Sequence, residues 1–442
     1  MAASQSNSPE DRQTSEDGSG PGSGRPGNGA GRLALTMGGG GARAAYQVGF
    51  LRAVAQRFPD LEIPILTGVS AGAINAVHLA AHPGTFREAV EDLTQLWLSL
   101  TMDRVFRVDS RSLALNAMRW GLQLVSGGRV HPPGVRSLVD TSPLRSYLGG
   151  ALGAHQGPIP GIAEKIEAGR LRALAVSTSS YSTGLSITWV QGNDQIGEWT
   201  RPLRRGIRTR ISLDHVMASA ALPLFFPAVQ IGDEWYGDGG LRLAAPLSPA
   251  LQLGGQRLLA ISTRFDRMEE EAERPVIHGH PPPAQIIGSL LNSIFLDLLD
   301  QDAWRVQAMN RILSRVPPEN RGHFRVVDLL TLRPSRDLGR MAQDFEAQLP
   351  GFFRFLVRGL GTRETESPDM LSFLLFEPGY LARMMEMGER DGEARMGEVE
   401  HLLAPKDEPR GPQGVAEIAE RTKPPRRPTR PRASGRPRSA EG

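Results

Sequence analysis

The chain of 442 residues contains no cysteine, which excludes disulfides, thiolate metal sites and cysteine nucleophiles. Its first thirty residues lack an apolar run, so we do not expect a Sec-type signal peptide there. One uncharged stretch, residues 63–81, has the length of a membrane span. However, its proline, glycine, serine, asparagine and histidine residues are unfavourable in hydrocarbon. We therefore predict a buried strand, a tight turn and a buried helix there, in a soluble, cytoplasmic protein without a transmembrane helix.

Positive charge is concentrated at the C-terminus. The whole chain carries a formal net charge of +3, yet residues 421–442 hold seven arginines and one lysine against one glutamate, so the rest is net acidic. Residues 1–30 are rich in Ser, Gly, Pro and Asn, and residues 405–442 are rich in Pro and Arg. Both lack apolar periodicity, which predicts a disordered leader and a disordered tail. The tail is a candidate for contact with anionic lipid or nucleic acid, the alternative being a solubilising terminus without a specific partner.

The body of the chain alternates strand-like and helix-like segments. Strands are predicted at residues 32–37, 63–67, 171–177, 186–190, 229–235, 257–263 and 325–330. Helices are predicted at residues 42–58, from about 71, at 86–100 and, as one long stretch, at 285–313. This alternation predicts a layered α/β domain with a largely parallel sheet. We divide it into a catalytic core, residues 31–250, and a mainly helical C-terminal part, residues 251–404, which is a candidate lid or membrane-facing surface.

A serine stands between a predicted strand and a predicted helix, in Gly68-Val69-Ser70-Ala71-Gly72. In this G-x-S-x-G pattern a sharp strand-to-helix turn holds the hydroxyl away from the sheet, and the small neighbours allow strand and helix to approach. The helix N-terminus adds a positive dipole where negative charge develops. Ser70 is therefore the candidate nucleophile, with Gly68 and Gly72 shaping its turn.

Consecutive glycines follow the first predicted strand, in the segment Gly38-Gly39-Gly40-Gly41-Ala42-Arg43. Such a loop exposes backbone N–H groups that converge on an anion, either a phosphate or an oxyanion. The loop also satisfies the G-x-G-x-x-A fingerprint of dinucleotide sites, which requires an acidic residue after the next strand. Here Asp60 and Glu62 precede that strand, and the serine turn follows it. We therefore favour an oxyanion loop.

An aspartate lies among glycines in Gly237-Asp238-Gly239-Gly240, after a strand-like segment. Alone, this pattern is typical of a hairpin turn. Beside the other two motifs Asp238 becomes a candidate catalytic residue in a glycine-rich loop. Just upstream, residues 217–227 (MASAALPLFFP) predict a small-residue helix and a proline-bounded apolar loop that pack beside the site.

The segments GGGGAR, GVSAG, ASAALPLFFP and DGG, in this order, resemble the patatin-like phospholipase family, as does the short segment Asp140–Leu144. The resemblance covers roughly residues 31–250. It implies a three-layer α/β/α fold with a mostly parallel central sheet and a Ser–Asp dyad without histidine. By position, Ser70 matches the nucleophile and Asp238 the base. Gly39, Gly40 and Gly41 fall in the oxyanion loop, with Arg43 beside them.

The resemblance further implies hydrolysis of a lipid carboxylic ester through an acyl-enzyme, at a membrane surface and without cofactor or metal. One departure from the family pattern is Ala44, where the glycine pattern ends in glycine. Alanine is still small enough for close packing of the following helix.

Two alternatives stay open. One is a Ser–Asp–His esterase, whose histidine would come from the downstream residues His278, His280, His323 and His401. The other is a non-catalytic membrane-binding module that keeps the fold. Its candidate membrane-facing or lid segments are residues 351–361 and 372–385, for which core packing is the competing interpretation.

Overall fold

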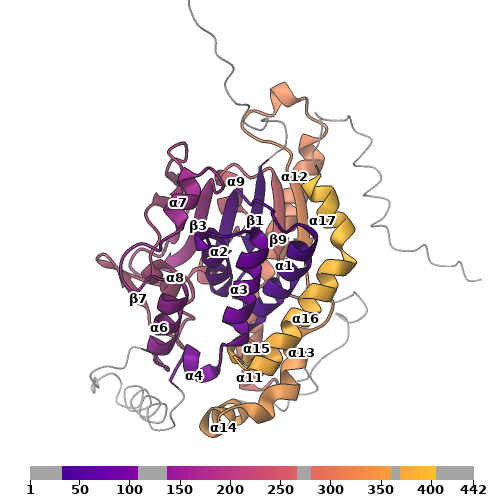
Figure 1. Cartoon of the computed structure of the whole chain (residues 1–442). Coiled ribbons are helices and arrows are strands. Elements are labelled where there is room, and N and C mark those ends of the chain that lie inside the picture. The colour runs from indigo at the N-terminus through magenta and orange to yellow at the C-terminus, as the bar shows by residue number, and fades with distance from the viewer. Residues whose placement is uncertain (1–31, 108–136, 266–279, 360–368, 405–442) are drawn as a thin grey trace, which may run out of the picture.

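The computed structural model describes residues 32–107, 137–265, 280–359 and 369–404 (Figure 1). The predicted disordered leader and tail, and the candidate histidine His278, lie outside these ranges. No helix among the described residues is both long enough and apolar enough to span a bilayer.

A ten-stranded sheet forms the centre of the described structure, in the order β10-β9-β1-β2-β3-β4-β6-β5, with β8 joined to β3 and β7 joined to β8. The strands are β1 (Leu33–Met37), β2 (Ile65–Val69), β3 (Ala173–Ser180), β4 (Ser186–Gly192), β5 (Trp199–Arg201), β6 (Arg204–Arg208), β7 (Val229–Ile231), β8 (Glu234–Asp238), β9 (Arg257–Ile261) and β10 (Asp328–Leu332). The run from β10 to β3 is entirely parallel. Its strands therefore end at one common edge, which is where parallel sheets carry their sites.

The helices cover both faces of the sheet. They are α1 (Ala45–Arg57), α2 (Ala71–Ala81), α3 (Phe86–Leu98), α4 (Met102–Val105), α6 (Ser142–Ala151), α7 (Ile162–Glu167), α8 (Leu213–Ser219), α9 (Ser248–Gln252), α11 (Pro283–Phe295), α12 (Asp297–Leu313), α13 (Leu338–Ala342), α14 (Gly351–Gly359), α15 (Asp369–Leu374), α16 (Pro378–Ala394) and α17 (Met396–Leu403). Short 3₁₀ turns include η1 (Gly41–Ala44), η2 (Gly239–Leu241), η3 (Pro318–Asn320) and η4 (Gln343–Gln348).

Side chains of β1 show how the layers form. Leu33, Leu35 and Met37 belong to the larger hydrophobic core, which they share with α1, α2, α3 and α16. Ala34 points to the other face and packs with residues of α9 and α12. Alternate residues of a strand point to opposite faces, so a strand that is buried on both faces is mostly apolar, and Thr36 is the one polar residue of β1. The three-layer α/β/α fold with a mostly parallel sheet is confirmed.

Two predicted elements differ from the structure. Residues 229–235 do not form one strand but the hairpin β7–β8, because Gly232 turns the chain with a positive φ of 60°. Residues 285–313 form two helices rather than one, since the chain bends at Leu296 between α11 and α12. The strands β5 and β6 were not predicted from the sequence.

The segment 372–385 belongs to the core. α15 is buried over its whole length, and α16 packs lengthwise against α1. This contact is close because glycines face backbone across it: a Cβ on Gly49 would lie 1.9 Å from the Met385 carbonyl oxygen, and one on Gly388 would lie 2.1 Å from that of Tyr46. The C-terminal part is thereby packed directly onto the layer that carries α2.

We predict that Gly388→Ala lowers the free energy of unfolding by about 1–3 kcal/mol, because the added methyl group forces the two helix backbones apart. Thermal unfolding followed by circular dichroism measures this change. Gly397→Ala is the matched control, since nothing lies within 4 Å of the position of its Cβ. Equal melting temperatures for both variants would show that the α1–α16 contact tolerates a wider spacing.

Candidate active site

Ser70 stands at the turn between β2 and α2 with φ 55° and ψ −132°, a backbone conformation that costs energy in a non-glycine residue. It is only 6% exposed. The neighbouring positions have room for glycine only. A Cβ on Gly72 would lie 2.4 Å from the carbonyl oxygens of Met37 and Gly38. A Cβ on Gly68 would lie 2.5 Å from the Gly72 carbonyl oxygen. The tight turn predicted from the G-x-S-x-G pattern is present.

Ser219 supports this turn from α8. Its hydroxyl accepts a hydrogen bond from the Ser70 N–H at 3.0 Å and donates one to the Ser177 carbonyl oxygen at 2.7 Å. Ser219 is fully buried. Sequence reasoning assigned its segment to core packing and missed this role, although the segment was among those that carried the family resemblance.

Asp238 ends β8, and its side chain reaches Ser70. One carboxylate oxygen, Oδ2, accepts a hydrogen bond from Ser70 Oγ at 2.6 Å. The other, Oδ1, accepts one from the Gly240 N–H at 2.9 Å. Gly239 has no room for a side chain, because its Cβ would lie 2.1 Å from the Ser177 carbonyl oxygen. Two residues 168 positions apart thus meet at the carboxyl edge of the sheet.

The carboxyl group of Asp238 is completely buried. Burial raises its pKa to about 7, because desolvation disfavours the charged form, while the hydrogen bonds from Ser70 and Gly240 act in the opposite direction. A carboxyl group with this pKa is a much stronger base than an exposed aspartate.

The carbonyl groups of Gly38, Gly39 and Gly40 in the glycine loop all accept hydrogen bonds. The Gly38 oxygen accepts from Gln47 Nε2 at 2.8 Å, the Gly39 oxygen from the Thr263 hydroxyl at 2.8 Å, and the Gly40 oxygen from the Arg43 N–H at 3.1 Å. Since N–H and C=O point in opposite directions across a trans peptide, the N–H groups of residues 39–41 point away from these partners.

The loop lies against Ser70. A Cβ on Gly39 would lie 3.1 Å from Ser70 Cβ. A buried relay of hydrogen bonds holds the loop. Trp97 Nε1 donates to Asn75 Oδ1 at 2.7 Å, and Asn75 Nδ2 donates to Gln47 Oε1 at 2.9 Å. Gln47 Nε2 in turn donates to the Gly38 carbonyl oxygen. No local sequence pattern pointed to this relay.

Arg43 is buried and turned toward the C-terminal part of the chain. Its guanidinium group donates to Ser372 Oγ and to Asp369 Oδ1, at 2.7 and 2.5 Å. The sequence placed Arg43 beside the oxyanion loop but gave no indication of these partners.

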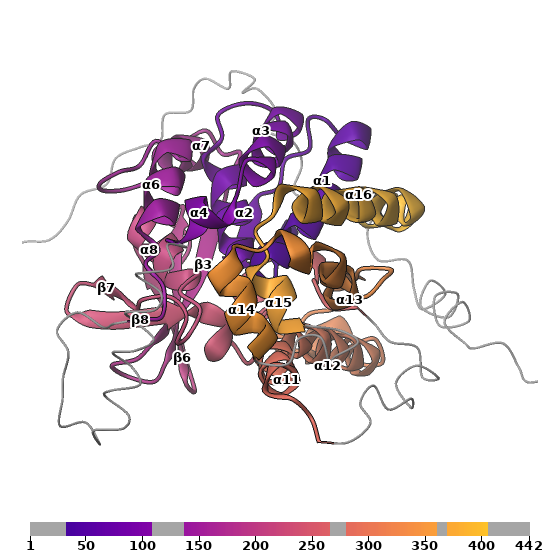
Figure 2. The ribbon, with the colours of Figure 1, turned by 90° about the horizontal axis from the view of Figure 1, so that it is seen from below.

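An apolar pocket opens beside Ser70. Gly40 and Gly41 line it together with Ser70, and no charged side chain of the described structure joins its lining. Aromatic side chains contribute much of the wall: Trp97, Phe226, Phe295, Phe373 and Phe376. The pocket is lined by α2 and α3 and by α4, α6, α11 and α15, and the last four lie toward the lower end of Figure 1 and toward the viewer in Figure 2.

The described histidines have other contacts. His280 bonds to the Pro281 carbonyl oxygen, His323 stacks on Phe324, and His401 is exposed on α17. The buried His215, which packs edge-on against Trp189, bonds to Ser212. Among the described residues, the side-chain hydrogen bonds of Ser70 and Asp238 involve no histidine.

Several solved structures are distantly similar. Human GIVD cytosolic phospholipase A2 in complex with methyl gamma-linolenyl fluorophosphonate is 13% identical, with 85% of this chain and 58% of that chain covered at a TM-score of 0.41. VipD from Legionella pneumophila is 13% identical, with 78% and 67% covered at 0.32. ExoU from Pseudomonas aeruginosa, in its complex with SpcU, is 16% identical, with 89% and 84% covered at 0.21.

No curated protein sequence matches the chain significantly. A family model described as patatin-like phospholipase matches residues 35–251. This range contains the glycine loop, Ser70 and Asp238, and it ends just before β9. Residues 35–251 are therefore a patatin-like phospholipase domain.

Proposed function

We propose that this protein hydrolyses the carboxylic esters of lipids, with Ser70 as nucleophile and Asp238 as general base. The observation that carries the proposal is the 2.6 Å contact between Ser70 Oγ and a fully buried carboxylate, at the mouth of an apolar pocket. A lipid acyl chain fits an uncharged, aromatic pocket, and its ester carbonyl then lies at the serine.

The first half-reaction forms an acyl-enzyme. Asp238 takes the hydroxyl proton while Ser70 Oγ attacks the ester carbonyl carbon. The tetrahedral intermediate collapses as the carbon–oxygen bond to the alcohol breaks, and the proton from Asp238 passes to the leaving oxygen. In the second half-reaction Asp238 takes a proton from water. Hydroxide addition and release of Ser70 then yield the fatty acid, with the proton returned to the serine.

The backbone N–H groups of Gly39, Gly40 and Gly41 are the proposed donors to the oxyanion. Support comes from the loop's position against Ser70 and from the hydrogen bonds of the three carbonyl groups, which leave these N–H groups pointing away from the carbonyl partners. Each such donor typically contributes about 10²–10³-fold to turnover. Arg43 has its guanidinium group occupied by Asp369 and Ser372, so we assign it to holding the loop rather than to the oxyanion itself.

The substrate is proposed to come from a lipid surface that the protein binds peripherally. Exposed apolar side chains lie on the elements around the pocket: Leu224 is 70% exposed, Ile286 and Leu290 on α11 are 46% and 57% exposed, and Phe355 on α14 is 71% exposed. α11 also supplies Phe295 to the pocket, and α14 lies at the same end of the molecule (Figure 2). Exposed apolar groups gathered at one end are typical of a membrane contact.

We predict that Ser70→Ala lowers kcat/KM by at least ~10³-fold and Asp238→Asn by at least ~10²-fold, since one removes the nucleophile and the other the base. The assay uses a short-chain p-nitrophenyl ester and a mixed-chain phosphatidylcholine, presented with and without liposomes. Mass spectrometry after treatment with a fluorophosphonate should place the adduct on Ser70.

Histidine variants separate the dyad from a triad. His278→Ala, His280→Ala, His323→Ala and His401→Ala should each retain turnover. A folded histidine variant as inactive as Ser70→Ala would establish a Ser–Asp–His esterase instead. The binding module would be established by two results together. Wild type would hydrolyse neither ester, and the Ser70→Ala variant would still bind liposomes.

The pKa of Asp238 predicts the acid limb of the pH profile. The carboxyl group must be deprotonated to accept the serine proton, so kcat/KM should fall about tenfold per pH unit below a pKa near 7. Initial rates of p-nitrophenyl ester hydrolysis between pH 4 and pH 9 test this, with the product read at its isosbestic wavelength. A limb that breaks near the pKa of an exposed aspartate would contradict the assigned base.

The same shift predicts a pH-dependent stability difference. Between the pKa of an unfolded aspartate, about 3.9, and the raised pKa near 7, the folded state binds more protons than the unfolded state. Wild-type stability therefore falls as pH rises through this window. Asp238→Asn should be more stable than wild type at pH 8, and the difference should shrink toward pH 4.

Urea unfolding at both pH values measures this difference. Asp233→Asn, at an exposed aspartate of the same hairpin, controls for the substitution. If the free energies of unfolding of Asp238→Asn and wild type differed by the same amount at both pH values, the Asp238 carboxyl group would not be desolvated as the structure shows.

A further inference from the structure

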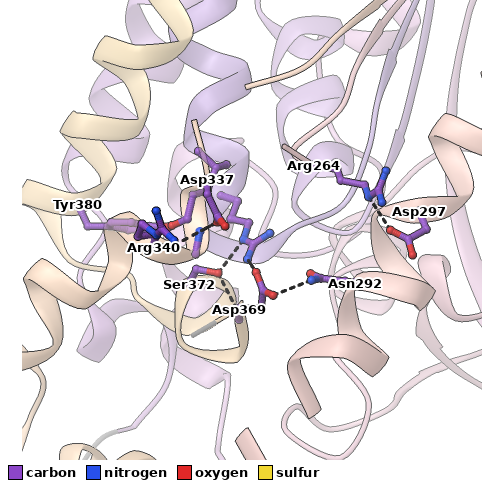
Figure 3. Close-up of polar contacts among 11 residues, drawn as sticks. Arg264, Asn292, Asp297, Asp337, Arg340, Asp369, Ser372 and Tyr380 are labelled. Carbon is purple, nitrogen blue, oxygen red and sulfur yellow. Dashed lines mark hydrogen bonds and ion pairs between the residues drawn. The ribbon is translucent and has the colours of Figure 1, made fainter. Parts of the chain in front are cut away.

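α15 binds the residue that follows the glycine loop. Arg43 is 3% exposed, and its Nε donates to Ser372 Oγ at 2.7 Å while Nη2 donates to Asp369 Oδ1 at 2.5 Å (Figure 3). The Phe373 ring lies under the guanidinium group, 4.8 Å from its central carbon. All three partners belong to one helix of six residues, more than 320 positions along the chain.

The carboxylate that holds Arg43 is itself fixed from a third element. Asp369 Oδ2 accepts a hydrogen bond from Asn292 Nδ2 of α11 at 2.8 Å, and Ser372 Oγ donates to the Asp369 carbonyl oxygen at 2.5 Å (Figure 3). Charged groups buried at this depth are tolerated only when paired and hydrogen-bonded, and this pair is both. The geometry of Arg43 therefore follows the position of α15 and α11.

The same helix also contacts the loop backbone. A Cβ on Gly41, whose φ is +56°, would lie 2.1 Å from the Phe373 carbonyl oxygen. Phe295 of α11 packs on Phe373 with ring centroids 6.2 Å apart, and its ring would lie 2.3 Å from a Cβ on Gly240. α15 thus packs against the glycine loop, and α11 packs against the loop that follows Asp238.

We infer that Asp369 is a positioning residue for the reaction, acting through Arg43 to hold the backbone N–H groups of Gly40 and Gly41 where the oxyanion forms. The inference rests on the proposed function and adds to it a requirement for α11 and α15, which lie outside the range that matches the family model. Without the carboxylate, the buried guanidinium group loses its counter-charge and moves toward water. The 3₁₀ turn that carries it, and the loop before that turn, move with it.

The test is Asp369→Asn, which keeps the size of the side chain and removes its charge. We expect kcat for a p-nitrophenyl ester to fall by about 10²-fold, the effect of one oxyanion donor, with KM changed less than twofold. Affinity for a trifluoromethyl ketone, whose adduct with Ser70 carries the oxyanion, should fall in parallel. Affinity for the product fatty acid, which needs no oxyanion donor, should stay unchanged.

Asp297→Asn is the matched control. Asp297 pairs with Arg264 at 2.7 Å in the same region of the molecule, and among the described residues no hydrogen bond or ion pair joins Asp297 to Arg43 (Figure 3). This variant should keep wild-type kcat. A second test combines the changes: because Asp369 acts through Arg43, Asp369→Asn should have no further effect on kcat in an Arg43→Met background.

Amide hydrogen exchange of residues 38–48 provides a readout that does not depend on turnover. Faster exchange there in Asp369→Asn than in Asp297→Asn is expected. If Asp369→Asn leaves both the exchange rate and kcat at their wild-type values, the inference is overturned. A raised KM with an unchanged kcat in this variant would also overturn it and would assign α15 to the acyl pocket alone. Loss of turnover in Ser70→Ala, measured in parallel, establishes the proposed function separately from the role of Asp369.

Discussion

The positive φ of Ser70 is the constraint on which the site depends. Such a backbone is stable only where its surroundings determine it completely, and each contact around the turn contributes. At Gly68 and Gly72 the backbone segments pack so closely that a side chain would not fit. The Ser219 hydroxyl accepts a hydrogen bond from the Ser70 N–H. Once the turn is fixed, the direction of Ser70 Oγ is fixed too. It points at the buried carboxylate of Asp238.

Burial of that carboxylate connects structure to chemistry. An aspartate in water is too weak a base for a serine hydroxyl near neutral pH, whereas desolvation brings the pKa of Asp238 to about 7. The two hydrogen bonds that it accepts keep the ionised form accessible. The same burial destabilises the folded protein as pH rises, so a strong base and a less stable fold have one physical origin.

How much the sequence could predict depended on the range of the interactions. Ser70, Asp238 and the glycines stand in short patterns whose backbone requirements are local, and parallel strands bring their ends to one edge. The hairpin at Gly232 was missed because residues on both sides of it favour strand, and the bend at Leu296 because apolar spacing continues through it. Ser219, the Trp97–Asn75–Gln47 relay and Asp369 contribute single polar side chains from distant segments, which no periodicity marks.

The glycine loop is held by residues from two parts of the chain. The relay from Trp97 reaches Gly38 from within the segment that matches the family model, whereas Thr263, Asp369 and Ser372 lie beyond it. Four glycines supply the close approach to Ser70 but no rigidity of their own, because glycine has the largest conformational freedom to lose. Rigidity must therefore come from neighbours, and the C-terminal helices supply it through a buried ion pair and a backbone contact. The oxyanion site that we propose on this loop therefore depends on the C-terminal helices as well as on the segment that matches the family model.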